Sequence, residues 1–243
     1  MERYLIPVYL PRGVYAGLRR VKGILIPPPT VANRNHPDLF GDRDIEWSYV
    51  ASRLPTGQGY VLDFGCGYGN MSIHAIQKGY RVLALDLETN RFPWWHPNVE
   101  MVCGDLLQID LPNGAFDFIL NCSSVEHVGL TGRYGVTVEE TDGDLASMQK
   151  LRTLLKASGK MLMTIPCGQD AAIVPWHRVY GKERLPKLLT GYEIEEEVYW
   201  VKRADNRWYP AHKDAALAYV PTSHPTIGVA CSYALGCFVL RPD

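Results

Sequence analysis

Residues 60–70 read YVLDFGCGYGN, and this stretch decides the fold. Its first part, residues 60–64, is a short apolar run that the following glycines interrupt. Residues 70–78 then favour a helix, which ends at Gly79 because glycine readily adopts the left-handed conformation found after a helix C-terminus. A strand, a glycine-rich loop and a helix are therefore predicted in this order. Glycines have no side chain, so the backbone N–H groups of this loop can approach a ligand closely. The loop is therefore a candidate binding site.

The chain beyond this unit alternates between helix and strand patterns. Short apolar runs lie at 81–86, 99–103, 116–121 and 160–165, and alternating or β-like runs follow at 192–201 and 227–240. Helical patterns lie at 45–51, from 145 to a stop at Gly159, and near 184–189. Strands that are apolar on both faces belong to a parallel sheet that crossover helices cover from each side. The sequence thus predicts an α/β fold.

An acidic residue follows the second strand where it can serve the glycine loop. Asp86 closes that strand 21 residues after Gly65, and a carboxylate at the tip of such a strand accepts the hydroxyls of a ribose in dinucleotide folds. The loop has the spacing G-x-G-x-G preceded by Asp63, whereas pyrophosphate-binding dehydrogenases prefer G-x-G-x-x-G. The loop and the acid together predict a nucleoside site.

Residues 61–69 resemble the first motif of the class I S-adenosylmethionine-dependent methyltransferases, and the resemblance extends over roughly residues 45 to 240. It implies a Rossmann-like α/β fold with a seven-stranded, mostly parallel sheet whose last strand is antiparallel, which accounts for the two C-terminal β-like runs. It also implies S-adenosylmethionine as the methyl donor and S-adenosylhomocysteine as the product. We expect no metal ion.

The same resemblance implies which residues hold the methyl donor. Asp86 matches the acid that binds the ribose, Asp105 matches the acid that meets the adenine amino group, and Asn121 ends a fourth-strand motif that faces the transfer site. The full cofactor-binding set is Asp63, Gly65, Cys66, Gly67, Gly69, Asn70, Asp86, Leu87, Asp105, Leu106 and Asn121. Two of these acids have another interpretation: Asp105 as a helix N-cap or turn residue, and Asp63 as an acceptor for backbone amides of the loop.

Acceptor chemistry is predicted where the fourth strand ends, at residues 122–130, which read CSSVEHVGL. Open α/β sheets place their ligands at this edge. Many small-molecule methyltransferases have a similar Glu-His pair here, which makes Glu126 and His127 candidate catalytic residues. The pKa of a histidine suits it to take the proton from a hydroxyl or ammonium acceptor. The alternative is a histidine that shapes the pocket, since transfer to a nucleophilic acceptor relies on proximity.

A longer string, residues 123–135 followed by 176–181, resembles a methyltransferase-like family of unassigned function that often accompanies glycan and secondary-metabolite genes. This resemblance places four residues around the acceptor: the substrate-binding residues Arg133, Tyr134 and Arg178, and a second candidate base, His177. Two arginines suit a carboxylate, a phosphate or a sugar acid, which they bind through paired hydrogen bonds. The alternative role of each arginine is to anchor a loop through backbone carbonyls.

Three further groups of side chains have a functional and a structural interpretation. The acids of residues 139–144 hold Mg²⁺, as in some sugar and catechol O-methyltransferases, or form a solvated loop. Residues 94–96, WWH, wall the adenine or acceptor pocket, or pack in the core or on the surface. Trp208 and Tyr209 belong to an aromatic insertion that we interpret as a wall on the acceptor side.

The first 43 residues differ in composition from the rest. Five of the first 22 residues are Lys or Arg, they are interleaved with apolar residues, and three prolines follow at 27–29. We interpret residues 1–43 as a strap or lid and residues 44–243 as the methyltransferase domain. A segment that lies on a membrane surface and a pad for a partner are the alternatives for the first part.

The charge of the chain indicates which class of partner it binds, and its cysteines indicate the cellular compartment. The chain has 25 Lys and Arg against 26 Asp and Glu, so no overall field favours nucleic acid or an anionic membrane. A small-molecule or sugar acceptor is expected. An RNA or protein methyltransferase, and a non-catalytic subunit that binds the cofactor and activates a partner, are the alternatives. The six cysteines contain no C-x-x-C pair, and no long apolar stretch or leader pattern is seen, so we expect free thiols and a cytoplasmic location.

Overall fold

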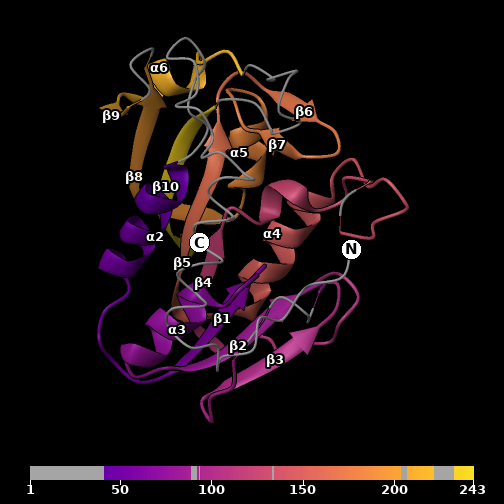
Figure 1. The fold of residues 1–243 in the computed structure, drawn as a ribbon, viewed down its shortest axis with the longest axis vertical. Coiled ribbons are helices and arrows are strands. Elements are labelled where there is room, and N and C mark those ends of the chain that lie inside the picture. The colour runs from indigo at the N-terminus through magenta and orange to yellow at the C-terminus, as the bar shows by residue number, and fades with distance from the viewer. Residues whose placement is uncertain (1–40, 89–91, 93, 133, 204–206, 222–232) are drawn as a thin grey trace, which may run out of the picture. The chain divides into compact units, whose positions relative to one another are not determined.

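The computed structural model describes residues 41–243, except for 89–91, 93, 133, 204–206 and 222–232 (Figure 1). The described part is an α/β fold around a sheet of eight strands in the order β3-β2-β1-β4-β5-β10-β8-β9. These strands are β1 (Tyr60–Phe64), β2 (Arg81–Asp86), β3 (Val99–Cys103), β4 (Phe116–Cys122), β5 (Leu155–Cys167), β8 (Tyr192–Lys202), β9 (Trp208–Ala211) and β10 (Ala234–Pro242). The predicted fold class is confirmed.

The direction of the strands matches the expected methyltransferase sheet. Strands β1 to β5 pair in parallel, and β10 runs antiparallel to both of its neighbours, β5 and β8. The last strand of the chain is therefore inserted antiparallel between β5 and β8 of a mostly parallel sheet, as the resemblance implies. Strand β9 is an addition to the seven expected strands. It pairs antiparallel with β8 and brings Trp208 and Tyr209 to this edge of the sheet.

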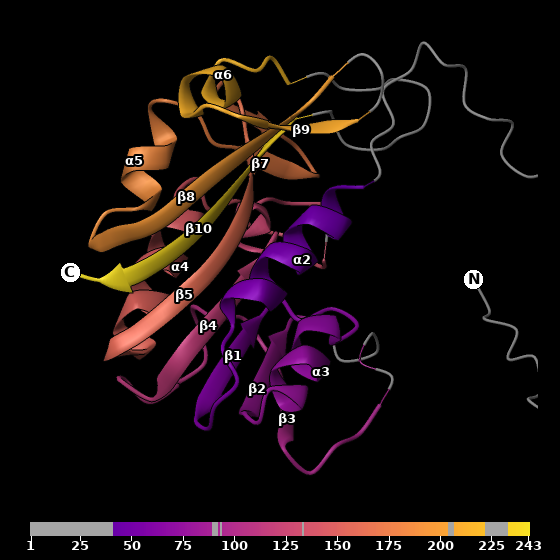
Figure 2. The same ribbon diagram turned by 90° about the vertical axis from the view of Figure 1, so that its left-hand side faces the viewer.

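Helices cover the sheet on both faces (Figure 2). They are α2 (Asp42–Arg53), α3 (Asn70–Gln77), α4 (Gly143–Leu154), α5 (Arg184–Leu188) and α6 (Lys213–Leu217). Helices α2 and α3 pack on one face, whereas α4, α5 and α6 pack on the other. Neighbouring strand residues serve opposite faces: Val61 packs with α2 and α3, and Leu62 packs with α4 and α5. Both are fully buried, and this burial on two sides is why the strands are continuously apolar in the sequence.

One predicted boundary is wrong. The helix expected to reach Gly159 ends at Leu154, and β5 begins at Leu155. Leu155 pairs with Phe116 of β4 and is buried in the sheet. A helix would also have buried Leu155 at this spacing, so hydrophobic periodicity does not distinguish the two structures here. Pairing with β4 decides between them.

Three small elements lie at the carboxyl ends of the parallel strands, where the sequence predicted loops. The 3₁₀ helix η2 (Val125–His127) follows β4. Strands β6 (Ala171–Ile173) and β7 (His177–Val179) form an antiparallel hairpin after β5. Strand β7 lies against η2, so the hairpin brings His177 toward His127.

Several expectations fall on residues outside the described ranges. The strap or lid is described only from residue 41 onward, where α2 begins at Asp42. The β-like run at 227–240 is described from Tyr233, with β10 beginning at Ala234. Within the described ranges, every helix is too short or too polar to span a membrane.

Candidate functional site

The glycine loop connects β1 to α3 through three residues in the left-handed region. Gly65, Gly67 and Gly69 have φ angles of 69°, 53° and 75°, which other residues adopt only with strain. A Cβ at Gly65 would lie 2.3 Å from Ser124 Oγ, whereas a Cβ at Gly67 would meet no atom of the described residues within 4 Å. Gly67 therefore faces open space, and its backbone is the part of the loop that a ligand can approach.

Asp86 lies beside Gly67, as the spacing in the sequence predicted. The Gly67 N–H donates to Asp86 Oδ2 at 2.8 Å, and the Glu88 N–H donates to Asp86 Oδ1 at 3.1 Å. These amides orient the carboxylate at the tip of β2 and leave a lone pair on each oxygen, because a carboxylate oxygen can accept two hydrogen bonds. The next residue, Leu87, is 41% exposed. The loop and Asp86 thus form one surface at the carboxyl end of the sheet.

Asp63 and Cys66 lie beneath the loop. Asp63 is buried and accepts a 2.5 Å hydrogen bond from the Ser72 hydroxyl of α3. Burial raises the pKa of the Asp63 carboxyl to about 6, although the hydrogen bond from Ser72 acts in the opposite direction. Cys66 is buried with its Sγ 3.8 Å from Met101 Sδ. Asp63 thus links β1 to α3 across the loop through Ser72, and its bond to amides of the loop stays a prediction.

Aromatic side chains of the β2–β3 connection pack on the end of the loop, just before Asn70 begins α3. The rings of Phe92 and Trp94 lie 4.4 Å apart between centroids. A Cβ at Gly69 would lie 2.4 Å from Phe92 Cε2, so a glycine is required there. The Trp94 Nε1–H donates to the Tyr68 carbonyl oxygen at 3.2 Å. Trp94 is therefore part of the wall of the glycine loop.

Two of the remaining predicted cofactor residues stabilise turns, and Leu106 packs in the core. Asp105 Oδ1 accepts the Leu107 N–H at 2.9 Å, which is the turn role allowed by the sequence. Leu106 is 2% exposed and belongs to the core. Asn121 is fully buried, and its Oδ1 accepts the Val125 N–H at 3.2 Å. The structure brings Asp105 to the ends of β2 and β3 but keeps the Asn121 side chain inside the core.

A second polar site lies where β4 and β5 end, and α2 contributes to it. We call it the acid–imidazole cluster, and its members are Asp42, Arg43, Glu46, Ser123, Glu126, His127, His177 and Tyr233. The Arg43 guanidinium lies 2.6 Å from Glu46 Oε2, and the Ser123 hydroxyl donates to the other Glu46 oxygen. The Tyr233 hydroxyl donates to Asp42 Oδ2 at 2.6 Å. Side chains from four separate segments thus share one polar region.

Glu126 is the least satisfied member of this cluster. Its side chain is 2% exposed, and its Oε2 has no hydrogen-bond partner among the described residues. Burial and the neighbouring Glu46 raise the pKa of Glu126 to about 8, while Arg43 acts in the opposite direction. The carboxyl group therefore exchanges its proton near neutral pH, as general acids and bases do.

His127 lies between Glu126 and the β6–β7 hairpin. Its Nδ1 is 2.5 Å from the Trp176 carbonyl oxygen, and its Nε2 is 3.7 Å from Glu126 Oε1. A carbonyl oxygen only accepts hydrogen bonds, so Nδ1 carries the proton when the ring is neutral, and the lone pair of the ring then lies on Nε2. The His127 ring lies 5.5 Å from the Tyr134 ring and 6.4 Å from the His177 ring, between centroids. The structure thus brings both predicted bases and Tyr134 together.

The backbone of this region is strained. Ser123 and Tyr134 have φ angles of 48° and 56°, and they are the described non-glycine residues with positive φ. Such conformations cost roughly 1 to 3 kcal/mol each and concentrate at functional sites. Both residues flank the acid–imidazole cluster, which supports a functional role for it.

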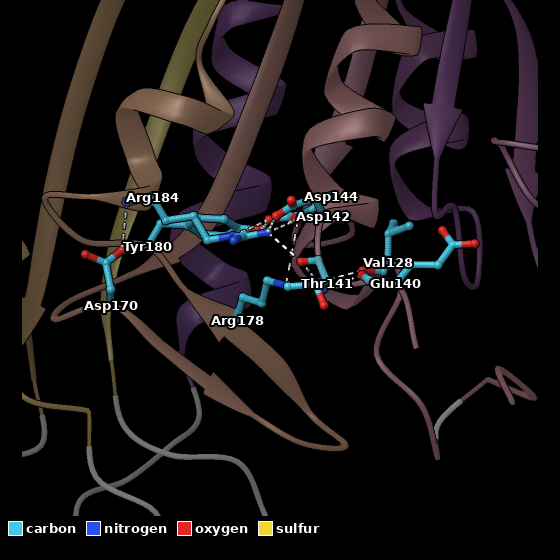
Figure 3. Close-up of polar contacts among 9 residues, drawn as sticks. All are labelled: Val128, Glu140, Thr141, Asp142, Asp144, Asp170, Arg178, Tyr180 and Arg184. Atoms are coloured by element: carbon cyan, nitrogen blue, oxygen red, sulfur yellow. Dashed lines mark hydrogen bonds and ion pairs between the residues drawn. The ribbon is translucent and has the colours of Figure 1, made fainter. Parts of the chain in front are cut away.

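Arg178 does not face the acceptor side with a free guanidinium, as the substrate-binding interpretation requires. Its Nη1 donates to the Val128 carbonyl oxygen at 2.5 Å and its Nη2 to the Glu140 carbonyl oxygen at 3.0 Å (Figure 3). The side chain is 4% exposed, and its Nε lies 3.7 Å from Asp144 Oδ1. Arg178 therefore anchors the segment between η2 and α4, which is the alternative role given above.

Asp144 completes this anchor, which we call the Asp144 clamp and which consists of Asp144, Arg178, Tyr180 and Arg184. The Arg184 Nε–H donates to Asp144 Oδ2 at 2.9 Å, and the Tyr180 hydroxyl donates to the same oxygen at 3.0 Å (Figure 3). Asp144 is thus a buried partner for arginines and not a metal ligand or a solvated acid. Among the described residues no group of side chains is arranged to bind a metal. Arg133 lies outside the described residues.

Sequence reasoning missed the contribution of α2 and of Tyr233. Glu46 lies on the buried face of α2 together with Tyr49 and Val50. An acid at this helical spacing from two buried residues was the available signal. Tyr233 follows a part of the chain that is not described, and its contact with Asp42 spans 191 positions of sequence. No local pattern indicates such a contact.

Comparisons with known proteins agree with this geometry. A model described as a methyltransferase domain matches residues 61–137, and a model described as a Caenorhabditis protein of unknown function matches residues 106–203. An uncharacterized protein of Methanocaldococcus jannaschii is 24% identical over 105 residues, which cover 43% of this chain. The match spans 40% of the length of that relative.

Structures of similar fold cover nearly the whole chain. A 1,6-didemethyltoxoflavin-N1-methyltransferase of Burkholderia thailandensis has 16% identity and a TM-score of 0.50, over 98% of this chain and 93% of that one. The PH0226 protein of Pyrococcus horikoshii has 15% identity and a TM-score of 0.52, over 87% and 97%. The [4+2]-cyclase SpnF has 14% identity and a TM-score of 0.55, over 95% and 94%. At these identities the likeness shows the fold.

The match to the methyltransferase domain begins inside β1 and runs through the glycine loop, β4 and η2. These are the elements that place Gly67, Asp86 and His127 at one edge of the sheet. With its antiparallel last strand inserted beside β5, the described part of the chain has the fold of the class I S-adenosylmethionine-dependent methyltransferases, and residues 61–137 match the methyltransferase-domain model.

Proposed function

We propose that the protein is an S-adenosylmethionine-dependent methyltransferase that transfers the methyl group to an oxygen or nitrogen of a small-molecule acceptor. The observation that carries this proposal is the pairing of Gly67 with Asp86. A backbone that faces open space lies 2.8 Å from a carboxylate at the tip of the next strand, which is the arrangement a nucleoside requires. The acid–imidazole cluster lies at the same edge of the sheet, where it can receive an acceptor.

The residues present fit the methyl donor. The amides of the glycine loop would bind its polar groups, the free lone pairs of Asp86 would accept the ribose hydroxyls, and Asp105 would face the adenine. When bound, the donor supplies an electrophilic methyl group on a sulfonium. The chain itself orients the acceptor, excludes water and accepts a proton at His127 or Glu126.

A small-molecule acceptor is favoured over RNA by the balanced charge of the chain. A sugar acid is not favoured as the acceptor, because the guanidinium of Arg178 already donates to backbone carbonyl oxygens. The [4+2]-cyclase among the similar structures is a reminder that this fold also supports other chemistry. Methyl transfer therefore has to be measured directly.

Isothermal calorimetry with S-adenosylmethionine and S-adenosylhomocysteine tests the cofactor half of the proposal. We expect micromolar binding of both, and at least about tenfold weaker binding by Asp86→Ala, because a charged hydrogen-bond acceptor is lost. Asp110→Ala is the matched control, since Asp110 is an exposed acid beyond β3. A folded protein that binds neither compound would contradict the proposal.

Methyl transfer is tested by measuring the release of S-adenosylhomocysteine in the presence of candidate acceptors. A protein that binds S-adenosylmethionine but releases no S-adenosylhomocysteine with any acceptor would be a non-catalytic subunit.

A further inference from the structure

We propose that the acid–imidazole cluster binds an ammonium group, so that the acceptor of the methyl transfer is an amine. This proposal rests on the proposed function for its connection to the reaction. The bound ammonium group would first give a proton to the ionised Glu126 carboxylate, and the amine lone pair would then form the N–C bond as the S–C bond of the donor breaks and S-adenosylhomocysteine leaves. The chemistry of the ligand follows from the hydrogen-bonding capacity, the charge and the surroundings of the cluster.

The hydrogen-bonding capacity left in the cluster consists of acceptors. Glu46 receives hydrogen bonds from Arg43 and Ser123, whereas Glu126 Oε2 is buried and has no partner among the described residues. A buried carboxyl oxygen without a donor is costly, because it has given up its hydrogen bonds to water. When Glu126 is ionised, a ligand that carries N–H donors would satisfy this oxygen, and a carboxylate or phosphate would not.

The charge of the cluster also favours a cation. Asp42, Glu46 and Glu126 are three carboxyl groups near one guanidinium, that of Arg43. His127 and His177 add positive charge only when they are protonated. Arg178 and Arg184 spend their guanidinium groups on Asp144 and on backbone carbonyls (Figure 3). The missing counter-charge beside Glu126 would therefore come from the ligand, because ionised carboxyl groups are stable in a buried site only when they are paired.

Aromatic rings surround the same region. The His177 ring lies 5.2 Å from the Tyr233 ring and 6.4 Å from the His127 ring, and His127 contacts Tyr134. Ring faces attract ammonium groups and pack against the carbon atoms attached to them. The Arg43 side chain is 45% exposed, so the cluster reaches solvent at the side of α2.

Two probes of equal size and opposite charge test this assignment: benzylamine and benzoate. Their binding to the full chain, saturated with S-adenosylhomocysteine, is measured by ligand-observed NMR. We expect benzylamine to bind more tightly than benzoate. We expect Glu126→Gln to weaken benzylamine binding by roughly tenfold or more, which corresponds to the loss of one charged hydrogen bond. Glu126→Asp, which keeps the charge, should retain the preference for the amine. Glu139→Gln is the matched control, because Glu139 is an exposed acid of the neighbouring loop.

Three outcomes would overturn the proposal: tighter or equal binding of benzoate, equal binding of benzylamine by wild type and Glu126→Gln, or no binding of benzylamine at all. If benzylamine does not bind, Glu46 and Glu126 have a structural role and are not accessible to a ligand. Thermal melting of each variant shows whether it is folded. Calorimetry with S-adenosylhomocysteine on the same samples separates the two proposals, since bound S-adenosylhomocysteine without amine binding contradicts the amine assignment and leaves the methyltransferase proposal intact.

Discussion

The two halves of the site are built in different ways. The glycine loop and Asp86 lie within 24 consecutive residues, 63–86, and the contact between them is made by a backbone amide. The acid–imidazole cluster takes side chains from α2, the segment from Ser123 through η2, β7 and the residue before β10, and its contacts join residues up to 191 positions apart. A site made by the local backbone can be recognised from glycine spacing. A site made by distant side chains depends on how the whole sheet is assembled.

The largest effect is expected for a substitution in the glycine loop. Gly67→Arg should abolish binding of S-adenosylhomocysteine, because the new side chain would fill the open space above the loop and force a non-glycine residue into positive φ. Gly114→Arg is the matched control, since Gly114 also has positive φ, at 62°, and meets no described atom within 4 Å. Calorimetry checks both variants. Equal losses would show that backbone strain, and not the site, is responsible.

The next largest effect concerns the Asp144 clamp, which anchors the segment between η2 and α4 beside the acid–imidazole cluster. Asp144→Asn should destabilise the fold by about 3 to 5 kcal/mol, because it leaves the buried Arg178 without its counter-charge and removes one of the two carboxylate partners of Arg184. Urea unfolding measures the loss. Asp142→Asn removes an acid that also contacts Arg184 but is 69% exposed, and it should cost at most about 1 kcal/mol. A mild effect of Asp144→Asn would mean that the clamp is not needed to hold the segment before α4.

A pH dependence of stability sharpens the comparison. The pKa of Glu126 rises from 4.5 to about 8 on folding, so the folded state holds an extra proton between these values. Its contribution to stability is therefore present at low pH and is lost as the pH rises through 8, with a slope of about 1.4 kcal/mol per pH unit at most. The Glu126→Gln variant lacks this pH-dependent contribution to stability. Relative to wild type, the variant should become more stable as the pH rises from 5 to about 9, when the nearby Glu46, Arg43 and His127 are unchanged. Parallel melting curves of the two proteins across this range would contradict the prediction.

The smallest effect concerns His127. Its Nδ1 is bonded to the Trp176 carbonyl oxygen and its Nε2 faces Glu126, so it can assist transfer through the Glu126 carboxyl and need not touch the acceptor. We expect His127→Ala to lower turnover by about tenfold while binding of S-adenosylmethionine is retained. His127→Asn, which preserves a donor toward Trp176, should recover part of the rate. Full activity of His127→Ala would reduce this residue to a part of the pocket wall.

The strand, loop and helix at 60–78, the parallel sheet and the position of Asp86 could all be predicted from the sequence. Each of them depends on neighbours along the chain: apolar runs bounded by glycine, helical spacing, and a fixed distance from the loop to the next strand. The boundary at Leu155 could not be predicted, because burial of this residue satisfies a helix and a strand equally, and pairing with Phe116 decides the outcome.

The roles of individual side chains at the acceptor end were decided by the tertiary structure. The sequence left two roles open for Arg178, to bind an anion or to anchor a loop, and the fold places the Val128 and Glu140 carbonyl oxygens within its reach. Glu46 had no assigned role, and packing of α2 brings it to Ser123. The sequence by itself determined the fold and the cofactor loop, since backbone conformation and local spacing encode them. Only the tertiary structure decided the chemistry beside them, because a charged side chain is defined by the partners that folding brings to it.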